Sequence, residues 1–398
     1  MNMRTLAKRS RPACAALAGV ALLLLIGACG NSDESTGDGG EAVRVVTIGH
    51  AGPLTGPIAH LGKDNENGVR LAIQEANEAG LVIAGEKIRF EMISEDDEGN
   101  PQKGTVVAQK IVDKNVAGVI GHLNSGTTIP ASKIYHDAGV AQISPSATNV
   151  DYTNQGYETA FRVMANDAQQ GKVLGEYAVN NLQAKKIAVI DDRSAYGKGL
   201  ADQFELAAKN AGGELVTREF TDTTKTDFTA ILTRIKGMKP DLVFYGGMDS
   251  QSGPMMKQIK NLGLKAAFLS GDGCQTKQFL TLAGEEGEGA YASSPGVPLA
   301  SMPDGPAFTE KYTKVFNQEI QLYAPYAYDA TNTLIAAMVQ ADSFDSAVYL
   351  PVLAKIQHQG VSAHVQFDEK GDIKGGGISL YKVTNGKWEY IETVGGGS

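Results

Sequence analysis

Two short segments of this chain are rich in hydroxyl groups, and each is associated with an apolar run that predicts a β-strand. Asn124-Ser125-Gly126-Thr127-Thr128 follows a strand expected at 116–121, and Ser144-Pro145-Ser146-Ala147-Thr148 follows one expected at 140–144. Where a strand leads into a helix, free backbone N–H groups and small hydroxyls can bind an anion. The same residues also serve as plain helix caps. Their occurrence after adjacent strands favours a carboxylate site.

Motifs of catalysis and nucleotide binding are incomplete. Gly56 to Lys63 resembles a phosphate-binding loop, but Asp64 stands where that loop requires Ser or Thr. The first strand is followed by Gly49-His50-Ala51-Gly52 instead of the G-x-G-x-x-G of a dinucleotide site. The residues around Ser125 lack the G-x-S-x-G elbow of a hydrolase. The sequence therefore argues against an enzyme.

Short apolar runs alternate with segments of helical periodicity along most of the chain. Strands are expected at 43–49, 87–94, 116–121, 140–144, 186–191, 214–220, 241–246 and 266–270. Amphipathic helices are expected between them. This βαβα order predicts parallel sheets covered by helices on both faces, and therefore an α/β fold with two doubly wound lobes.

The pattern changes after Pro295. Consecutive helices are expected at 305–318, 326–342 and 346–358. A hairpin-like stretch follows at 361–394, with turns at Asp368-Glu369-Lys370-Gly371 and Asn385-Gly386. These late elements are expected to be shared between the two lobes.

The N-terminal segment has the order of an export signal. A basic start precedes an apolar run at 13–26, and Ile26-Gly27-Ala28-Cys29 closes the segment. The run is too short for a good transmembrane helix. Its ending resembles the lipobox of bacterial lipoproteins, so we expect a signal peptide at 1–28, a lipid on Cys29 and a flexible polar tether at 29–42. A plain secretory signal with an incidental cysteine is the alternative.

Composition limits the possible partners of the remaining chain. Residues 1–28 hold four Lys or Arg and no Asp or Glu, so their removal takes the formal charge from -9 to -13. This balance argues against nucleic acids and anionic lipid surfaces. Beyond Cys29 the remaining cysteine is Cys274, which excludes an intramolecular disulfide between unmodified cysteines. The six histidines show no metal-ligand spacing, and no cofactor is expected.

An ordered set of motifs resembles the Leu/Ile/Val-binding proteins of bacterial ABC importers. The set is Gly118-Val119-Ile120-Gly121-His122-Leu123 with Ser125, Ile143-Ser144-Pro145-Ser146-Ala147-Thr148, Tyr196-Gly197-Lys198-Gly199 and Phe244-Tyr245-Gly246-Gly247. The likeness runs from about residue 43 to about residue 375. It implies a type I periplasmic binding fold, in which two lobes joined by three crossovers close on an amino acid without changing it. Lobe I would comprise 43–165 and 296–366, and lobe II 166–295 and 367–398.

The resemblance also implies a set of ligand-binding residues. Lobe I would hold the ligand carboxylate and ammonium through Ser125, Ser146 and Thr148, with Ala147 in the same turn. Lobe II would contribute Tyr196 and Asp272, and a buried ammonium does require an anionic partner. Met248, Tyr323 and Tyr326 are candidates for the pocket wall, with a place in the core as the alternative for the two tyrosines. The alternatives are that Asp272-Gly273 is only a turn, and that Tyr196 caps the helix expected at Gly197 or simply packs.

The sequence departs from the family at several of these positions. Met248 and Leu61 stand where similar proteins carry aromatic residues, and Asp272 replaces a longer Glu. A disulfide frequent in the family is absent, because Gly99 and Asn124 occupy its positions. The resemblance thus implies a monomeric protein that delivers an amino acid, branched-chain or similar, to a membrane permease. A sensor for another small carboxylate or amide stays open.

Overall fold

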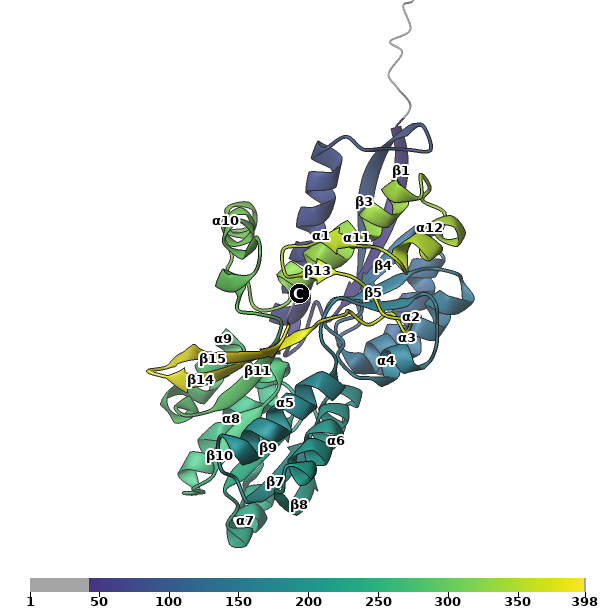
Figure 1. Ribbon diagram of the computed structural model, residues 1–398. Helices are drawn as coiled ribbons and strands as arrows, with labels where there is room; N and C mark the ends of the chain where they lie inside the picture. Colours follow the sequence, from purple (N-terminus) through teal and green to yellow (C-terminus); the bar gives the residue numbers. More distant parts are fainter. Residues whose placement is uncertain (1–42, 397–398) are drawn as a thin grey trace, which may run out of the picture. The chain divides into compact units, whose positions relative to one another are not determined.

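The computed structural model describes residues 43–396, and two β-sheets organise this part of the chain (Figure 1). Sheet A contains β1 (Val43–Gly52), β2 (Val82–Ile83), β3 (Glu86–Asp96), β4 (Gly118–Gly121), β5 (Gln142–Ser144) and β6 (Ala160–Arg162). The strands lie in the order β2-β3-β1-β4-β5-β6. The short β2 is antiparallel to β3, and the other pairs are parallel.

Sheet B has seven strands. They are β7 (Lys186–Asp191), β8 (Glu214–Phe220), β9 (Leu242–Gly246), β10 (Ala267–Ser270), β11 (Tyr291–Pro295), β14 (Gly377–Thr384) and β15 (Lys387–Gly395). The order is β15-β14-β11-β10-β9-β7-β8, parallel from β8 to β11 and antiparallel at β14 and β15. A separate antiparallel pair joins β12 (His358–Gln359) to β13 (His364–Val365).

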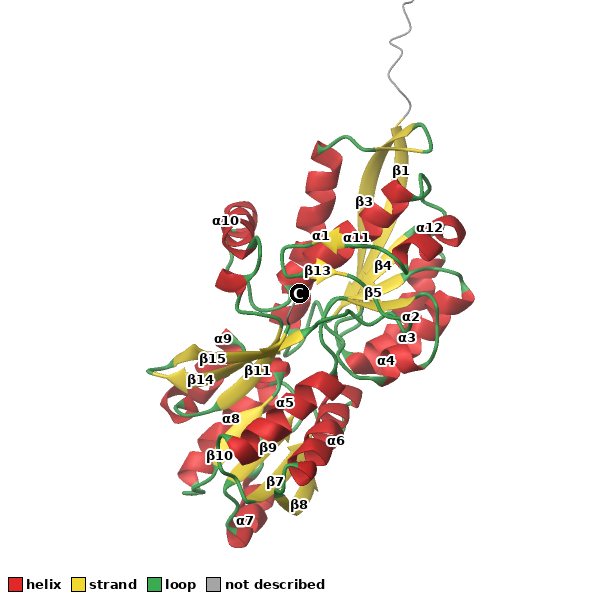
Figure 2. Ribbon diagram, viewed as in Figure 1, coloured by secondary structure: helices red, strands yellow, loops and turns green. Residues whose placement is uncertain are grey.

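Helices connect the parallel strands, and further helices follow between β11 and β12, as Figure 2 shows. Beside sheet A they are α1 (Ala59–Glu78), α2 (Pro101–Val112), α3 (Ser125–Asp137), α4 (Asp151–Asn154), α10 (Gly305–Phe316), α11 (Ala324–Gln340) and α12 (Ser346–Leu353). Beside sheet B they are α5 (Asp167–Asn180), α6 (Ala195–Asn210), α7 (Thr229–Met238), α8 (Asp249–Asn261) and α9 (Lys277–Ala283). Three 3₁₀ turns complete the set at Asp272–Cys274, Gly284–Gly287 and Leu299–Ser301.

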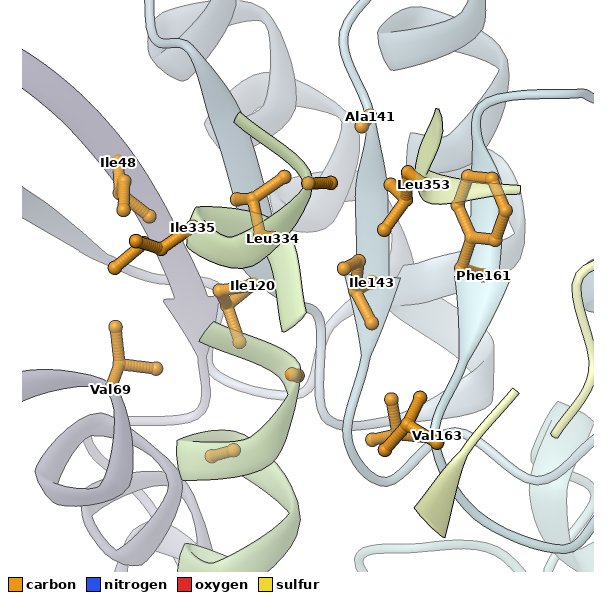
Figure 3. Packing of buried hydrophobic residues seen from close by; sticks show 14 of the residues in the cluster. Ile48, Val69, Ile120, Ala141, Ile143, Phe161, Val163, Leu334, Ile335 and Leu353 are labelled. Atoms are coloured by element: carbon orange, nitrogen blue, oxygen red, sulfur yellow. The ribbon is translucent and has the colours of Figure 1, made fainter. Parts of the chain in front are cut away.

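Alternation along the strands places a core on each face of each sheet. Successive side chains of a strand point to opposite faces, so Val119 of β4 packs with α2 and α3 while Ile120 packs with α1 and α11. Figure 3 shows Ile120 among side chains of neighbouring strands, opposite Val69 of α1 and Leu334 of α11. Sheet B is covered on both faces in the same way, by α5 and α6 on one and by α7, α8 and α9 on the other. The expected α/β class, with parallel sheets covered by helices, is confirmed.

The chain passes between the two sheets three times. The crossovers run after β6 at 163–166, after β11 at 296–298 and before β14 at 366–376. They lie side by side, because Gly296 N donates to Gly377 O at 2.7 Å. A Cβ on Gly376 would likewise lie 3.0 Å from the Cβ of Ala165. The structure thus contains the three crossovers that the resemblance implies.

Three strands and part of the hairpin differ from the sequence expectations, and the first of these strands is the two-residue β2. The strand β6 was not predicted because it has three residues, and β11 was not predicted because its sequence Tyr-Ala-Ser-Ser-Pro has little apolar character. Pairing and burial decide their conformation: β6 is buried at the edge of sheet A, where it pairs with β5, and β11 lies between β10 and β14. The hairpin is confined to β14 and β15, joined at Asn385-Gly386, where both residues have positive φ. Residues 366–376 instead form the third crossover, and α12 ends at Leu353 instead of 358.

Candidate ligand-binding site

The first hydroxyl-rich turn lies at the carboxyl end of β4. Ser125 begins α3 and is buried, and its Oγ accepts a hydrogen bond from Asn149 N at 3.2 Å. The hydroxyls of Thr127 and Thr128 both donate to Asn124 O, at 3.0 and 2.8 Å. The backbone N–H groups of Thr127 and Thr128 also donate to Asn124 O, so the N–H groups that remain without a backbone partner at the start of α3 are those of Ser125 and Gly126. Of the hydroxyls in this turn, Ser125 is the one left to contact a ligand.

The second turn leaves the neighbouring strand β5. Ser144 Oγ donates to His122 O at 3.0 Å, and Ser146 Oγ donates to Leu123 O at 3.2 Å, so both hydroxyls tie this turn to the segment that follows β4. Thr148 Oγ1 is buried and makes no hydrogen bond of ordinary geometry within residues 43–396, although it lies close enough to the Asp167 carboxyl to lower the pKa of that group. A buried hydroxyl without a partner is costly in a finished core. Thr148 is therefore the residue of this turn most available to a ligand.

Asp272 follows β10 in sheet B, is buried and accepts three side-chain hydrogen bonds. Its Oδ1 accepts from Gln170 Nε2 at 2.9 Å and from the Tyr196 hydroxyl at 2.8 Å. Its Oδ2 accepts from the Tyr323 hydroxyl at 2.7 Å. Burial raises the pKa of Asp272, while the donors Tyr323, Gln170 and Tyr196 lower it. These contacts hold a carboxylate whose four lone-pair positions include one more for a ligand N–H group.

The predicted wall residues of sheet B surround this carboxylate. Tyr196 lies in the first turn of α6, and its hydroxyl also accepts from Gly273 N at 3.0 Å. The cap of α6 is Ser194, whose hydroxyl accepts from Gly197 N, so the alternative role of Tyr196 as a helix cap is wrong. Met248 precedes α8, and its sulfur would lie 2.8 Å from a Cβ on Gly273.

Tyr323 and Tyr326, the two candidate wall residues near the start of α11, make different contacts. Tyr323 lies just before α11 and reaches Asp272, as described above. The Tyr326 hydroxyl instead donates to Pro295 O at 2.6 Å and so contacts the second crossover. Leu61 is fully buried in the core between sheet A and its helices. The structure therefore places Tyr323 with Asp272, whereas Tyr326 has a contact at the hinge.

Direct contacts join the turns of sheet A to the helices of sheet B. Asn149 Nδ2 donates to Ala195 O, at the start of α6, at 2.5 Å. On another side, His60 Nε2 of α1 lies 2.8 Å from Asp249 Oδ2 of α8. Tyr323 and Asp272 make the third such contact. The serine and threonine turns and the Asp272 group thus lie on opposite sides of one interface between the sheets.

A second buried acid, which sequence reasoning missed, lies near Asp272. Burial, and next the negative charge of Asp272, raise the pKa of Asp167 to about 8, against the opposing effects of Thr148, Arg162 and Gln170. Near neutral pH most Asp167 carboxyls are therefore protonated, and Asp272 remains the acid better placed to carry the charge. Asp167 and Gln170 open α5 after the first crossover, where the sequence has no signal beyond the helix cap at Asn166.

Two further features concern the described residues as a whole. The positions of the missing family disulfide are adjacent, because a Cβ on Gly99 would lie 3.3 Å from Asn124 Oδ1. No helix within residues 43–396 has the length and apolar composition to span a bilayer. The expected signal peptide, tether and lipid site at Cys29 lie outside the described residues.

Two doubly wound sheets joined by three crossovers, with hydroxyl-bearing turns facing a buried acid, define a type I periplasmic binding fold. A family model described as periplasmic binding protein matches residues 45–387. The chain belongs to this family. The family is one of solute-binding proteins and not of enzymes, and membership implies a location outside the cytoplasm.

Individual relatives give the same result. A Leu/Ile/Val-binding protein homolog 1 from Brucella suis is 36% identical over 358 residues, which cover 89% of this chain and 95% of the relative. An amino acid binding protein from Pseudomonas aeruginosa is also 36% identical, over 86% of this chain and 91% of its own length. A branched-chain amino acid transporter substrate-binding protein from Streptococcus pneumoniae, solved with isoleucine, has a TM-score of 0.80 at 28% identity, covering 88% of this chain and all of the other.

Proposed function

We propose that this protein is an extracytoplasmic lipoprotein, anchored through Cys29, that captures an amino acid and delivers it to the permease of an ABC importer. The ligand is branched-chain or of similar size, and the protein acts as a monomer. Lobe I comprises 43–165 and 296–366, and lobe II comprises 166–295 and 367–398. Closure of the lobes about the three crossovers encloses the ligand, because only the closed form contacts it from both sides.

The observation that carries this proposal is the complementarity of the two sides to a zwitterion. Ser125, Thr148 and the first N–H groups of α3 suit a carboxylate, because a helix N-terminus attracts negative charge. Asp272 suits an ammonium, since a buried cation requires a charged partner. The aromatic ring of Tyr196 beside that position adds a cation–π attraction. Ser146 and Ala147 shape the turn, and Met248 and Tyr323 form the wall.

The relatives support an amino acid and leave its side chain open. The Brucella protein is named for leucine, isoleucine and valine, and the Streptococcus structure contains isoleucine. In this chain Met248 and Leu61 replace aromatic residues and Asp272 is shorter than Glu, so the pocket differs in shape. The second candidate function is that of a sensor that binds a small carboxylate or amide. These substitutions favour it.

A thermal-shift screen of amino acids, aromatic acids and small amides tests the ligand class. A ligand at a hundred times its dissociation constant stabilises the folded state by about 2.7 kcal/mol, so we expect leucine, isoleucine or valine to raise the unfolding temperature. A shift with benzoate or an amide and none with any amino acid would favour the second candidate. Turnover of the bound compound would contradict both binding functions.

A further inference from the structure

Arg162, at the end of β6, is a fully buried cation with every donor in use. Its Nη1 donates to Ala147 O and Asn149 O, both at 2.8 Å. Its Nη2 donates to Thr153 Oγ1 at 3.0 Å and to Asp372 Oδ1 at 2.6 Å. Its Nε donates to the same Asp372 oxygen at 2.9 Å. A guanidinium has five N–H groups, so Arg162 has no donor left for any other role.

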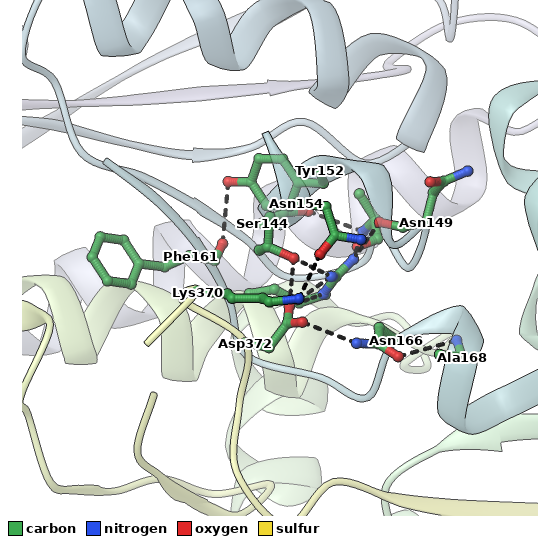
Figure 4. A network of polar contacts seen from close by, with 12 residues as sticks. Ser144, Asn149, Tyr152, Asn154, Phe161, Asn166, Ala168, Lys370 and Asp372 are labelled. Carbon is green, nitrogen blue, oxygen red and sulfur yellow. Dashed lines mark hydrogen bonds and ion pairs between the residues drawn. The ribbon is translucent and has the colours of Figure 1, made fainter. Parts of the chain in front are cut away.

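Asp372 balances this charge from the third crossover. It lies 210 residues from Arg162 in the sequence and its side chain is only 13% exposed. Its second oxygen accepts from Asn166 Nδ2 at 2.9 Å, and Asn166 belongs to the first crossover. Asn166 is held in turn, because its Oδ1 caps α5 by accepting from Ala168 N and Gln169 N. Figure 4 shows the contact that joins Asp372 to Asn166, with Ala168 next to Asn166.

We infer that Arg162 and Asp372 are positioning residues that couple the turn at 147–149 to the hinge. The contacts join three segments: the turn that carries Thr148, the first crossover and the third crossover. Two of those segments must move when the sheets rotate about the crossovers, and the third holds a candidate ligand contact. We call the Arg162–Asp372 ion pair and its contacts to Ala147, Asn149 and Asn166 the joint. The joint transmits hinge movement to the turn without touching the ligand. The inference rests on the proposed function only in treating this turn as a ligand contact.

Asp372→Asn tests the joint with little change in size. The new amide retains an oxygen for Arg162, but it turns an N–H₂ group toward the Nδ2 donor of Asn166. Asn166 cannot rotate to accept without losing its bonds to the start of α5. The double variant Asn166→Asp/Asp372→Asn restores an acceptor opposite the new amide, keeps a helix-capping residue and returns the original charge. Lys370→Ala is the matched control, because Lys370 lies in the same third crossover as Asp372 but its Nζ contacts Asn154 of α4, which belongs to neither of the other two coupled segments.

Hydrogen exchange of the segment 145–150, measured in the full-length protein without ligand, shows directly how firmly the joint holds this turn. The amides of Ala147 and Asn149 donate to Ser144 Oγ and Ser125 Oγ, so a fixed turn protects them. We expect exchange at least tenfold faster in Asp372→Asn, within threefold of wild type in the double variant, and unchanged in Lys370→Ala and in β9. Unchanged exchange in Asp372→Asn together with a lower unfolding temperature would overturn the inference, because the pair would then only stabilise the fold.

Calorimetric titration with L-leucine and L-isoleucine adds the functional readout. We expect Asp372→Asn to bind at least tenfold more weakly than wild type at a temperature where both are folded, with recovery in the double variant. If Asp372→Asn does not fold, Asn166→Ser replaces it, because serine still caps α5 but is too short to reach Asp372. We expect hydrogen exchange of the segment 145–150 to be at least threefold faster in Asn166→Ser than in wild type. Equal exchange in the two proteins would contradict the joint. A wild type that binds neither compound contradicts the proposed function instead, while the exchange result decides the joint.

Discussion

Asp272 receives hydrogen bonds from Gln170 of α5, Tyr196 of α6 and Tyr323 beside α11. These residues are 102, 76 and 51 positions away in the sequence. The partners orient the carboxylate before any ligand arrives, which reduces the entropy lost on binding. Asp272 is thus preorganised for a cation, while Thr148 Oγ1, without a partner among the described residues, is available for a ligand group.

We predict that Asp272→Ala weakens amino-acid binding far more than Ser125→Ala. The loss of Asp272 leaves the ligand ammonium buried without its charged partner, which costs about 3 to 5 kcal/mol. Ser125 shares the carboxylate with N–H groups and Thr148, so its loss costs about 0.5 to 1.5 kcal/mol. Calorimetric titration of both variants with the best ligand measures the difference. Binding by Asp272→Ala within a few-fold of wild type would show that the ligand lacks an ammonium at this position, and the amino-acid assignment would fall.

The pH dependence of stability gives a test of Asp167. Its pKa is about 8 in the folded protein against 3.8 for an exposed carboxyl, so its contribution is complete below pH 3.8 and is lost as the pH rises through 8. Between these values wild type should lose up to about 1.4 kcal/mol of unfolding free energy per pH unit relative to Asp167→Asn, which mimics the neutral acid. Urea unfolding of both proteins from pH 5 to pH 8 measures this difference. Parallel curves would contradict the shift.

The helices α5 and α6 pack closely against each other. A Cβ on Gly175 of α5 would lie 2.6 Å from the Cβ of Ala207 and 2.6 Å from Ala208 N of α6. Contact with backbone leaves little room for relaxation, so this glycine permits the close approach of the two helices. The helix α6 also carries Tyr196 and the carbonyl that Asn149 contacts, so its position matters for the site.

We predict opposite effects for two glycine-to-alanine substitutions in helices. Gly175→Ala should lower the unfolding free energy by about 1 to 3 kcal/mol, because overpacking outweighs the gain in helix propensity. Gly237→Ala in α7 is the matched control, since a Cβ there would have no atom within 4 Å. It should raise stability by about 0.4 to 1 kcal/mol. Chemical denaturation compares the two, and equal effects would show that the helix contact is looser than described.

Closure is the property of the whole molecule on which the proposed function depends. The ligand should bridge the two sheets, so its binding energy shifts the population toward the closed form. We predict that small-angle scattering gives a smaller radius of gyration at saturation with ligand. The contacts Tyr323–Asp272, Asn149–Ala195 and His60–Asp249 are expected to persist in that form. A radius that does not change on saturation would count against a two-lobe clamp.

Anchoring is the other property of the whole molecule. If Cys29 carries the lipid, Cys29→Ser should abolish retention in the detergent phase, because acyl chains supply the membrane affinity and the polar tether at 29–42 supplies none. Phase partitioning of wild type and variant from the native host measures this. Cys274→Ser is the control, since that cysteine is buried beside sheet B. Aqueous partitioning of the wild type would leave Cys29 without a lipid role.

The sequence by itself determined the α/β class, the alternation that builds the sheets and the turns that carry Ser125, Thr148 and Asp272. These features depend on residues close together in the chain, so periodicity and turn composition reveal them. It did not indicate Gln170 or Asp167 at the site, the coupling of Arg162 to Asp372, or the strand β11. Each depends on a contact between distant segments, because burial and long-range pairing determine which polar groups meet. Only the tertiary structure decided that Tyr323 would contact Asp272 and Tyr326 would contact the hinge.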